Sequence, residues 1–166
     1  MQTPRRLQCL IVAVGALMLL AARATSAAQD ATPAQPIMNE VLGRGLPNDA
    51  PGKVLQLEQY TFAPEAVIPT HTHPGAYLIY VESGDFGFTV IKGDAEITHA
   101  GSTEAEPIQA GAEVVAHQGD ALFENGGVVH SARNAGTTPV VVYTAALLDT
   151  NQPGITMTND EGTPMP

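Results

Sequence analysis

Short apolar segments recur along the middle of this chain, and each one ends at Gly, Pro, Asn or Asp. None of them shows a helical period over three turns, whereas several alternate polar and apolar residues as strands do. A spacing of about ten residues between such segments is typical of β-sandwiches and barrels. The pattern therefore predicts an all-β domain. The expected strands are residues 53–62, 77–81, 86–91, 111–116, 121–123, 128–132 and 139–148.

The N-terminus predicts a signal peptide over residues 1–28. Arg5 and Arg6 precede an uncharged run over residues 7–22, and small residues follow at 24–28. This is the order of a secretory leader, with cleavage expected after residue 27 or 28. An uncleaved anchor is the alternative, but the run is shorter than the roughly 18–20 residues that a spanning helix needs. We therefore expect a secreted or periplasmic protein.

The rest of the chain divides by composition. Residues 29–50 predict a proline-broken linker, within which residues 37–46 form a possible edge strand or exchanged arm. Residues 51–149 hold the strand-like segments and predict one barrel. Residues 150–166 are rich in Gly, Pro and Asn, and predict a loosely attached tail.

Charge and cysteine content exclude several functions. Loss of residues 1–28 leaves 4 basic residues of the original 7 against 17 acidic ones, so the formal charge falls from −10 to −13. Such a surface repels phosphate backbones and anionic membranes, so neither nucleic acid nor a membrane is an expected partner after cleavage. The single cysteine, Cys9, leaves with the leader, which excludes disulfides and thiolate chemistry.

Three of the five histidines stand where strands can gather them. His71 and His73 are two residues apart, so in an extended strand both side chains point to the same face. His130 lies in a later strand-like segment that can pair within the same barrel. Neutral imidazoles are good ligands for divalent Fe, Zn, Cu and Ni. The spacing therefore predicts a metal site, although the His-x-His pair alone is a weak signal.

Two stretches of sequence strengthen this prediction. Residues 69–84, PTHTHPGAYLIYVESG, and residues 119–134, GDALFENGGVVHSARN, resemble the two motifs of the cupin superfamily. The motif positions are occupied by His71, His73, Gly84, Gly119, Gly127, His130 and Asn134. The resemblance implies a single cupin-type jelly-roll barrel, a double-stranded β-helix. It also implies that His71, His73 and His130 bind a divalent transition metal (Fe, Mn, Zn, Ni or Cu), and that the protein is a possible homodimer.

The chain departs from the cupin pattern at three positions. Tyr77 stands where the family has a glutamate ligand, Glu65 where the first motif opens with Gly, and Asn125 where the second has Pro. Glu82 has the opposite strand parity to Tyr77 and is expected to face outward. Tyr77 can be a fourth ligand, a hydrogen-bond donor to a bound molecule, or a space-filling residue. Because an unperturbed phenol has a pKa near ~10, the last two roles are favoured.

A site of three neutral imidazoles leaves the full charge on the ion, which favours a small anionic or chelating partner. Three functions follow. The first is an exported metal-binding cupin whose small-molecule ligand is unknown. The second is an Fe(II)-dependent three-histidine dioxygenase that acts on a thiol, diketone or carboxylate. The third is a metal-free binding or interaction module. Only Tyr77 is expected to face inward as an acid or base, which weighs against an enzyme.

Overall fold

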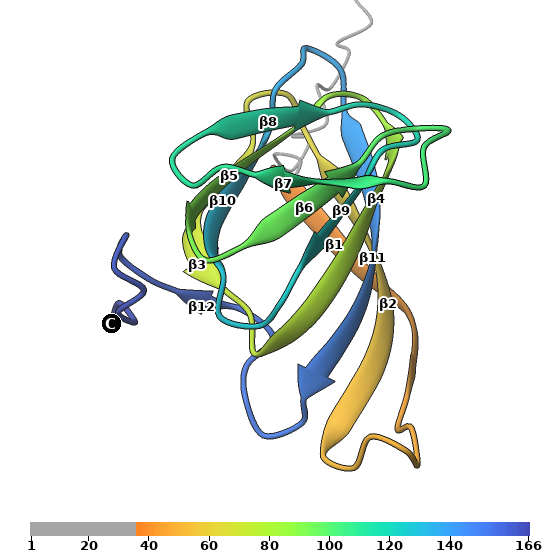
Figure 1. Ribbon diagram of the computed structural model, residues 1–166, viewed down its shortest axis with the longest axis vertical. Coiled ribbons are helices and arrows are strands. Elements are labelled where there is room, and N and C mark those ends of the chain that lie inside the picture. The colour runs from red at the N-terminus through yellow and green to blue at the C-terminus, as the bar shows by residue number, and fades with distance from the viewer. Residues whose placement is uncertain (1–35) are drawn as a thin grey trace, which may run out of the picture. The chain divides into compact units, whose positions relative to one another are not determined.

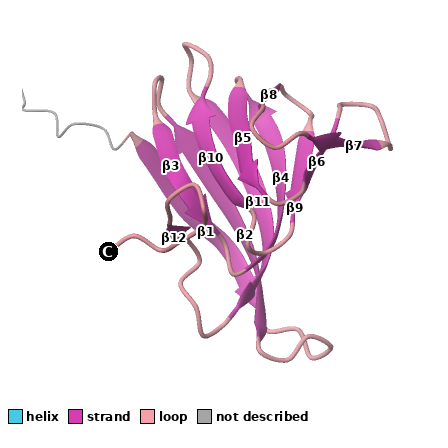
Figure 2. Ribbon diagram, turned by 60° about the vertical axis from the view of Figure 1, so that its left-hand side comes forward, coloured by secondary structure: helices cyan, strands magenta, loops and turns pink. Residues whose placement is uncertain are grey.

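The computed structural model describes residues 36–166; the predicted signal peptide lies outside the described residues. This part of the chain contains no helix, and every regular element is a strand (Figure 2). No helix that is long and apolar enough to cross a membrane is found in it. The prediction of an all-β fold is confirmed.

The described residues form twelve strands in two antiparallel sheets. The larger sheet has the order β1-β2-β11-β4-β9-β6-β7, and the smaller has the order β12-β3-β10-β5-β8. In Figure 1, β3, β10 and β5 lie on one side of the barrel and β4, β11 and β2 on the other. The strands are β1 (Ile37–Gly45), β2 (Lys53–Phe62), β3 (Val67–Thr72), β4 (Gly75–Ser83), β5 (Phe86–Lys92), β6 (Ala95–Thr98), β7 (Ala105–Ile108), β8 (Glu113–Ala116), β9 (Ala121–Glu124), β10 (Val129–Asn134), β11 (Val140–Asp149) and β12 (Thr156–Met157).

Buried and more exposed residues alternate along the long strands, and the buried ones line the barrel interior. On β11 every second residue from Val140 to Leu148 is buried, and on β2 the buried residues are Val54, Glu58 and Phe62. Successive side chains of a strand point to opposite faces, so one face of each sheet lines the core. This core is aliphatic apart from a few aromatic rings, among them Phe62 and Phe88.

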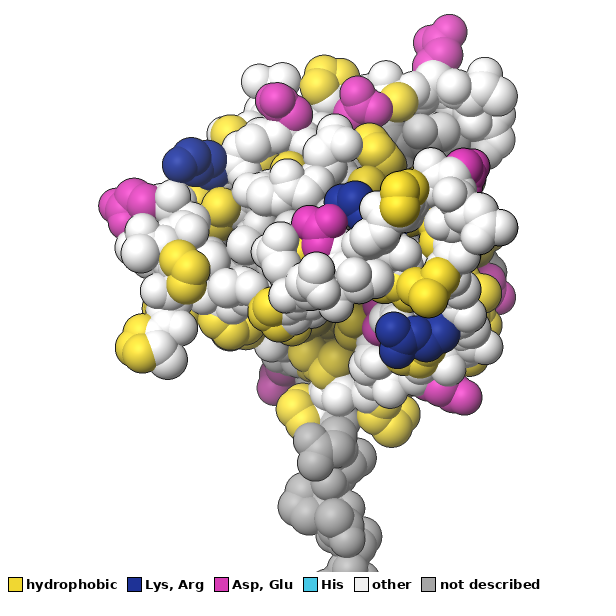
Figure 3. All heavy atoms as spheres, turned by 90° about the horizontal axis from the view of Figure 1, so that it is seen from below, with side chains coloured by type: hydrophobic (Ala, Val, Ile, Leu, Met, Phe, Trp, Pro, Cys, Tyr) yellow, Lys and Arg dark blue, Asp and Glu magenta, His cyan; other side chains and the backbone are white. Residues whose placement is uncertain are grey.

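The outward face of the larger sheet is also apolar in places. Leu55 and Leu57 on β2, Leu78 and Tyr80 on β4, and Phe123 on β9 are exposed. Because β11 joins β2 to β4, and β4 pairs with β9, these side chains share one surface. Figure 3 shows a view from below in which the surface is mixed: hydrophobic, acidic and basic side chains are interspersed on it.

The two ends of the described chain both join a sheet. Residues 37–45 form β1, which pairs with β2 of its own chain at the edge of the larger sheet. The expectation of a loose tail after residue 150 is wrong for residues 156–158. Thr156 and Met157 pair with β3, and buried Thr158 donates its backbone N–H to the carbonyl of Thr70 at 3.0 Å. Two more strands, β6 and β7, lie where the sequence showed no clear strand.

Two positions of the cupin-like pattern have a left-handed backbone conformation, residues 84 and 65. Gly84 has φ +83°, and a Cβ there would lie 2.8 Å from the Val140 side chain, so this turn requires glycine. Glu65 has φ +67° at the position where the cupin pattern opens with Gly. The chain therefore keeps a left-handed conformation at residue 65, where a residue with a Cβ is strained.

Candidate metal centre

His71 and His130 are direct neighbours across two paired strands. β3 and β10 are antiparallel, and their register places His71 opposite His130. The centroids of the two rings lie 4.1 Å apart, and both side chains are buried. The register shifts between His130 and Ala132, which marks a bulge of the kind that re-aims side chains next to binding sites.

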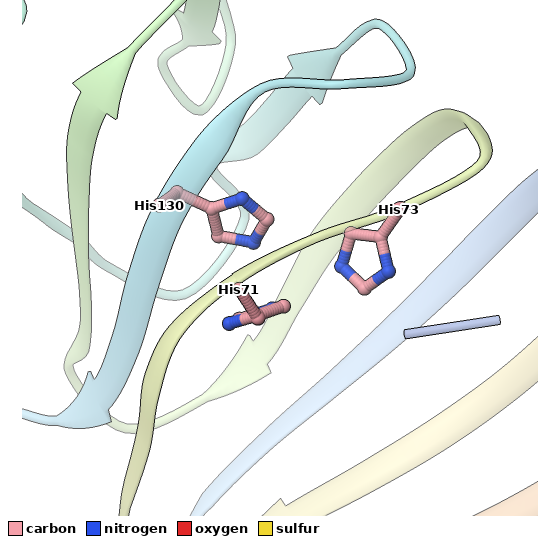
Figure 4. A group of neighbouring side chains, drawn as sticks. All are labelled: His71, His73 and His130. Atoms are coloured by element: carbon pink, nitrogen blue, oxygen red, sulfur yellow. The ribbon is translucent and has the colours of Figure 1, made fainter. Parts of the chain in front are cut away.

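His73 completes the group from the residue just beyond β3. Its ring centroid lies 4.9 Å from that of His71 and 5.2 Å from that of His130. Figure 4 shows the three side chains gathered in one region of the barrel. The candidate ligand atoms of the three rings all lie within 4.8 Å of one another. Nitrogen–metal bonds near ~2.1 Å allow three such atoms to share one ion.

Backbone carbonyls orient each ring. The Nδ1 nitrogens of His71 and His73 lie 2.7 Å from the carbonyl oxygens of Pro69 and Gly154, and that of His130 lies 3.3 Å from the Val128 oxygen. A carbonyl only accepts hydrogen bonds, so each Nδ1 carries the proton and each Nε2 keeps its lone pair. Outer hydrogen bonds of this kind fix ligand histidines in metalloproteins. The arrangement leaves three Nε2 atoms for a metal ion.

Glu124 at the end of β9 brings a carboxylate into the same place. Its Oε2 lies 3.0 Å from Nδ1 of His130, and its Oε1 lies 3.7 Å from Nε2 of His73. The side chain is 1% exposed, and neither oxygen has a hydrogen-bond partner among the described residues. The N–H of His130 faces Val128 rather than Glu124. A buried carboxylate without partners is costly unless a cation or a proton compensates it. The donor set therefore fits a divalent ion.

A small cavity lies beside these residues inside the barrel. Its volume is about 50 Å³, far below the roughly 300 Å³ at which pockets for drug-sized ligands begin. A space of this size could accommodate an ion with a few waters or a very small molecule. His73 also borders a second, larger space of about 560 Å³. The cavity is lined by Tyr60, Phe62, Ile68, His71, His73, Tyr77, Ile79, Phe86, Phe88, His130, Ala132, Val142, Thr144 and Ile155.

Known proteins resemble this chain in three-dimensional structure, but none of those compared matches it by sequence. No sequence model of a known family matches the chain, and no curated protein matches it. A solved cupin superfamily protein from Desulfitobacterium hafniense is 16% identical, with a TM-score of 0.44, over 73% of this chain and 84% of that one. The structural neighbours are cupin-superfamily proteins.

Other similar structures are longer enzymes. Salicylate 1,2-dioxygenase from Pseudoaminobacter salicylatoxidans has 14% identity and a TM-score of 0.47, over 71% of this chain. Oxalate decarboxylase from Bacillus subtilis has 22% identity and a TM-score of 0.41, over 57% of this chain. The match spans only 26% and 22% of those two chains, and 44% of the similar DMSP lyase structure. At these identities the likeness concerns the fold and not a shared activity.

Tyr77 occupies the cupin glutamate position and packs against a histidine. Its ring centroid lies 4.1 Å from that of His73, and the side chain is buried in the cavity wall. Burial, with smaller contributions from Tyr60, Glu58 and Glu124, raises the pKa of Tyr77 far above its usual value. A phenol that resists ionisation fits packing or hydrogen-bond donation better than ligation as phenolate.

Glu124 is the residue that sequence reasoning missed. No acidic side chain was expected to face inward, and this expectation is wrong for both Glu124 and Glu58. One signal was available, because Leu122 and Glu124 are two residues apart and must share a face if the strand continues. The prediction ended that strand at residue 123, whereas β9 extends to Glu124, directly opposite Tyr77 on β4.

Burial keeps the three imidazoles neutral. It lowers the pKa of His71, it lowers that of His73 to about 4, and it lowers that of His130 well below the usual range. Burial also raises the pKa of Glu124 well above its usual range. Desolvation disfavours the charged form in each case. A neutral imidazole is the form that binds a metal ion. Because the three rings are already neutral, no Nε2 proton has to leave before an ion binds.

Proposed function

We propose that this chain is an exported metal-binding protein in which His71, His73 and His130 hold a divalent transition-metal ion. The observation that carries the proposal is the orientation of the rings, each with Nδ1 on a backbone carbonyl and Nε2 left free. Fe, Mn, Zn, Ni and Cu are the candidate ions, since imidazole suits most of this series. When bound, the ion supplies a Lewis acid that can polarise a small molecule.

A metal-free role is disfavoured by the same residues. Three imidazoles, those of buried His71 and His130 and half-buried His73, converge beside Glu124, whose two oxygens lack hydrogen-bond partners among the described residues. Buried polar groups that lack partners destabilise a fold by about 1–3 kcal/mol each. A metal ion would compensate the Glu124 carboxylate and bind the free Nε2 atoms of the three rings, which favours a metal-binding role over an interaction module.

The cavity limits the partner to a small molecule. Its surface is mostly apolar, with hydroxyl groups from Tyr60, Tyr77 and Thr144. Burial, together with nearby Glu58, raises the pKa of Tyr60, so these groups are neutral hydrogen-bonding partners. We propose a small, partly apolar molecule that enters past His73 and contacts the ion. An anionic or chelating group on that molecule would bind the ion directly.

An Fe(II)-dependent dioxygenase activity is the second candidate. It is favoured by the position of Tyr77, whose ring packs on His73 and borders the cavity. That residue can hold a bound thiol, diketone or carboxylate in place. Oxygen uptake by the iron-loaded protein over these substrate classes tests this candidate, and it fails if none is consumed faster than with the apoprotein.

The outward face of the larger sheet supports a homodimer. Leu55, Leu57, Leu78, Tyr80 and Phe123 expose apolar surface on neighbouring strands. Contiguous apolar surface of this kind marks protein interfaces. We propose that two copies of the chain pair through this face.

Metal analysis of protein purified from its native compartment tests the proposed function. We expect close to one transition-metal ion per chain in the wild type and almost none in His130→Ala. His117→Ala is the matched control, because His117 is exposed and contacts Asp85 away from the cluster. A His130→Ala protein that retains its metal would overturn the ligand set. Cell fractionation tests export: the mature protein should lie outside the cytoplasm without residues 1–28.

A further inference from the structure

We propose that Glu124 is a fourth ligand of the metal centre, so that a carboxylate from β9 replaces the one that cupins carry on β4. The inference rests on the proposed three-histidine site and adds a residue to it. Glu124 lies beside two of the three histidines. Its Oε1 is 3.7 Å from Nε2 of His73, a nitrogen left for the ion, and its Oε2 is 3.0 Å from Nδ1 of His130, the nitrogen that carries the proton.

The strand register explains how a neighbouring strand can provide this ligand. Tyr77 and Glu124 are directly opposite each other in the β4–β9 ladder, and both side chains are buried. Residues in this relationship have Cβ atoms only about 4.5–5.5 Å apart. A glutamate side chain spans such a distance, so its carboxylate can reach the centre from β9. The Tyr77 ring meanwhile packs on His73, where a β4 glutamate would otherwise lie.

The surroundings of Glu124 point to a cation as its partner. Neither carboxylate oxygen accepts a hydrogen bond from the described residues, and no Lys or Arg among them forms an ion pair with it. Two other carboxylates are buried among the described residues. Glu58 accepts a hydrogen bond on Oε1 from the side-chain amide of Asn39 at 3.1 Å, although its Oε2 has no partner, and Asp120 accepts the backbone N–H groups of Ala100 and His117. Glu124 differs from both, because neither of its oxygens has a hydrogen-bond partner among the described residues and because it lies beside the histidines.

A carboxylate ligand changes the electrostatics expected of the site. Three neutral imidazoles leave a charge of +2 on a divalent ion, whereas one bound carboxylate reduces the charge of the centre to +1. The centre then attracts a small anion less strongly than the sequence suggested. A neutral or singly charged chelating molecule becomes the better partner.

Cobalt binding tests the inference without any assumption about activity. Co²⁺ is titrated into metal-free wild type, Glu124→Gln and Glu58→Gln, and the visible absorption of bound Co²⁺ reports its ligand set. For Glu124→Gln we expect an affinity at least about tenfold lower, as for other changes at metal sites, and altered absorption bands. Glu58→Gln, the matched control, should keep the affinity and the bands of the wild type.

The outcomes separate the inference from the proposed function. If the wild type itself binds no Co²⁺ or other divalent metal, the three-histidine site fails and the inference with it. If wild type and Glu124→Gln bind Co²⁺ equally well, only the inference is overturned. It is also overturned if the affinity falls while the absorption bands stay unchanged, because Glu124 would then only orient His130. Circular dichroism of each metal-free variant verifies folding, and Glu124→Ala replaces the Gln variant if that one is unfolded.

Discussion

His130 on β10 lies directly opposite His71 on β3, and their ring centroids are 4.1 Å apart. An ion bound by both rings links the two strands, and it binds the folded chain only. Ligands that bind only the native state raise its stability, by about 2.7 kcal/mol at a concentration 100 times the dissociation constant.

Added metal should therefore raise the thermal unfolding temperature of the wild type, and a chelator should reverse the effect. His130→Ala should show no metal-dependent shift, because one ligand is lost. Differential scanning calorimetry with and without chelator measures both. Equal metal-dependent shifts in the two proteins would contradict the role given to His130.

The contribution of His73 to the stability of the metal-free protein should be lost as the pH is lowered from 7 to 4, whereas buried Glu124, whose pKa is raised, contributes in the opposite direction. Burial lowers the pKa of His73 to about 4, while an unfolded chain has the ordinary value of 6.5. The unfolded state therefore takes up a proton first, and stability present above pH 6.5 is lost as the pH falls toward 4. The loss is on the order of 3 kcal/mol for this residue. Urea unfolding at several pH values, with chelator present, measures it. The free energy of unfolding should fall more steeply with pH in the wild type than in His73→Gln, and equal pH dependence in the two proteins would be contrary to this expectation.

Glu65→Gly should stabilise the fold. Glu65 has φ +67° and is exposed, so glycine relieves the strained backbone without loss of a packed side chain. The expected gain is about 1 kcal/mol in the free energy of unfolding. Urea denaturation of the two proteins provides the comparison. Glu82→Gly is the control at an exposed strand position and should destabilise; a loss of stability in Glu65→Gly would show that the strain is absent.

Removal of the C-terminal segment should weaken metal binding. The Nδ1–H of His73 donates to the carbonyl of Gly154, and β12 pairs with β3. A chain that ends at residue 150 loses the acceptor that orients His73, and outer hydrogen bonds of this kind affect metal affinity by about 10–100-fold. A chain that ends at Thr158 keeps both features and is the control. Isothermal titration with Zn²⁺ compares the two, and equal affinities would rule out this role for Gly154.

Leu57→Glu together with Leu78→Glu should convert a dimer into a monomer. Both side chains are exposed on the apolar outward face of the larger sheet, so the charges do not disturb the barrel interior. Burying these carboxylates between two copies would be strongly unfavourable. Sedimentation equilibrium measures the mass. Val67→Glu, an exposed position on the smaller sheet, is the control and should stay dimeric. A monomeric wild type would dismiss the proposed interface.

The sequence by itself determined the features that depend on local periodicity. The two-residue spacing of His71 and His73 places them on one face, and the alternation along residues 53–62 and 139–148 predicts β2 and β11 closely. The cupin-like motifs added His130 to the pair. These inferences hold because the pleat of a strand has a period of two wherever the strand lies.

Only the tertiary structure decided which strands lie side by side. The place of Glu124 beside the histidines depends on the pairing of β4 with β9, and the acceptor of His73 comes from the C-terminal segment at Gly154. Register between distant strands is set by the packing of the whole barrel, and a shift of one residue would turn Glu124 to the outside. No local pattern encodes that choice, so the carboxylate beside the candidate metal centre became visible only in the folded chain.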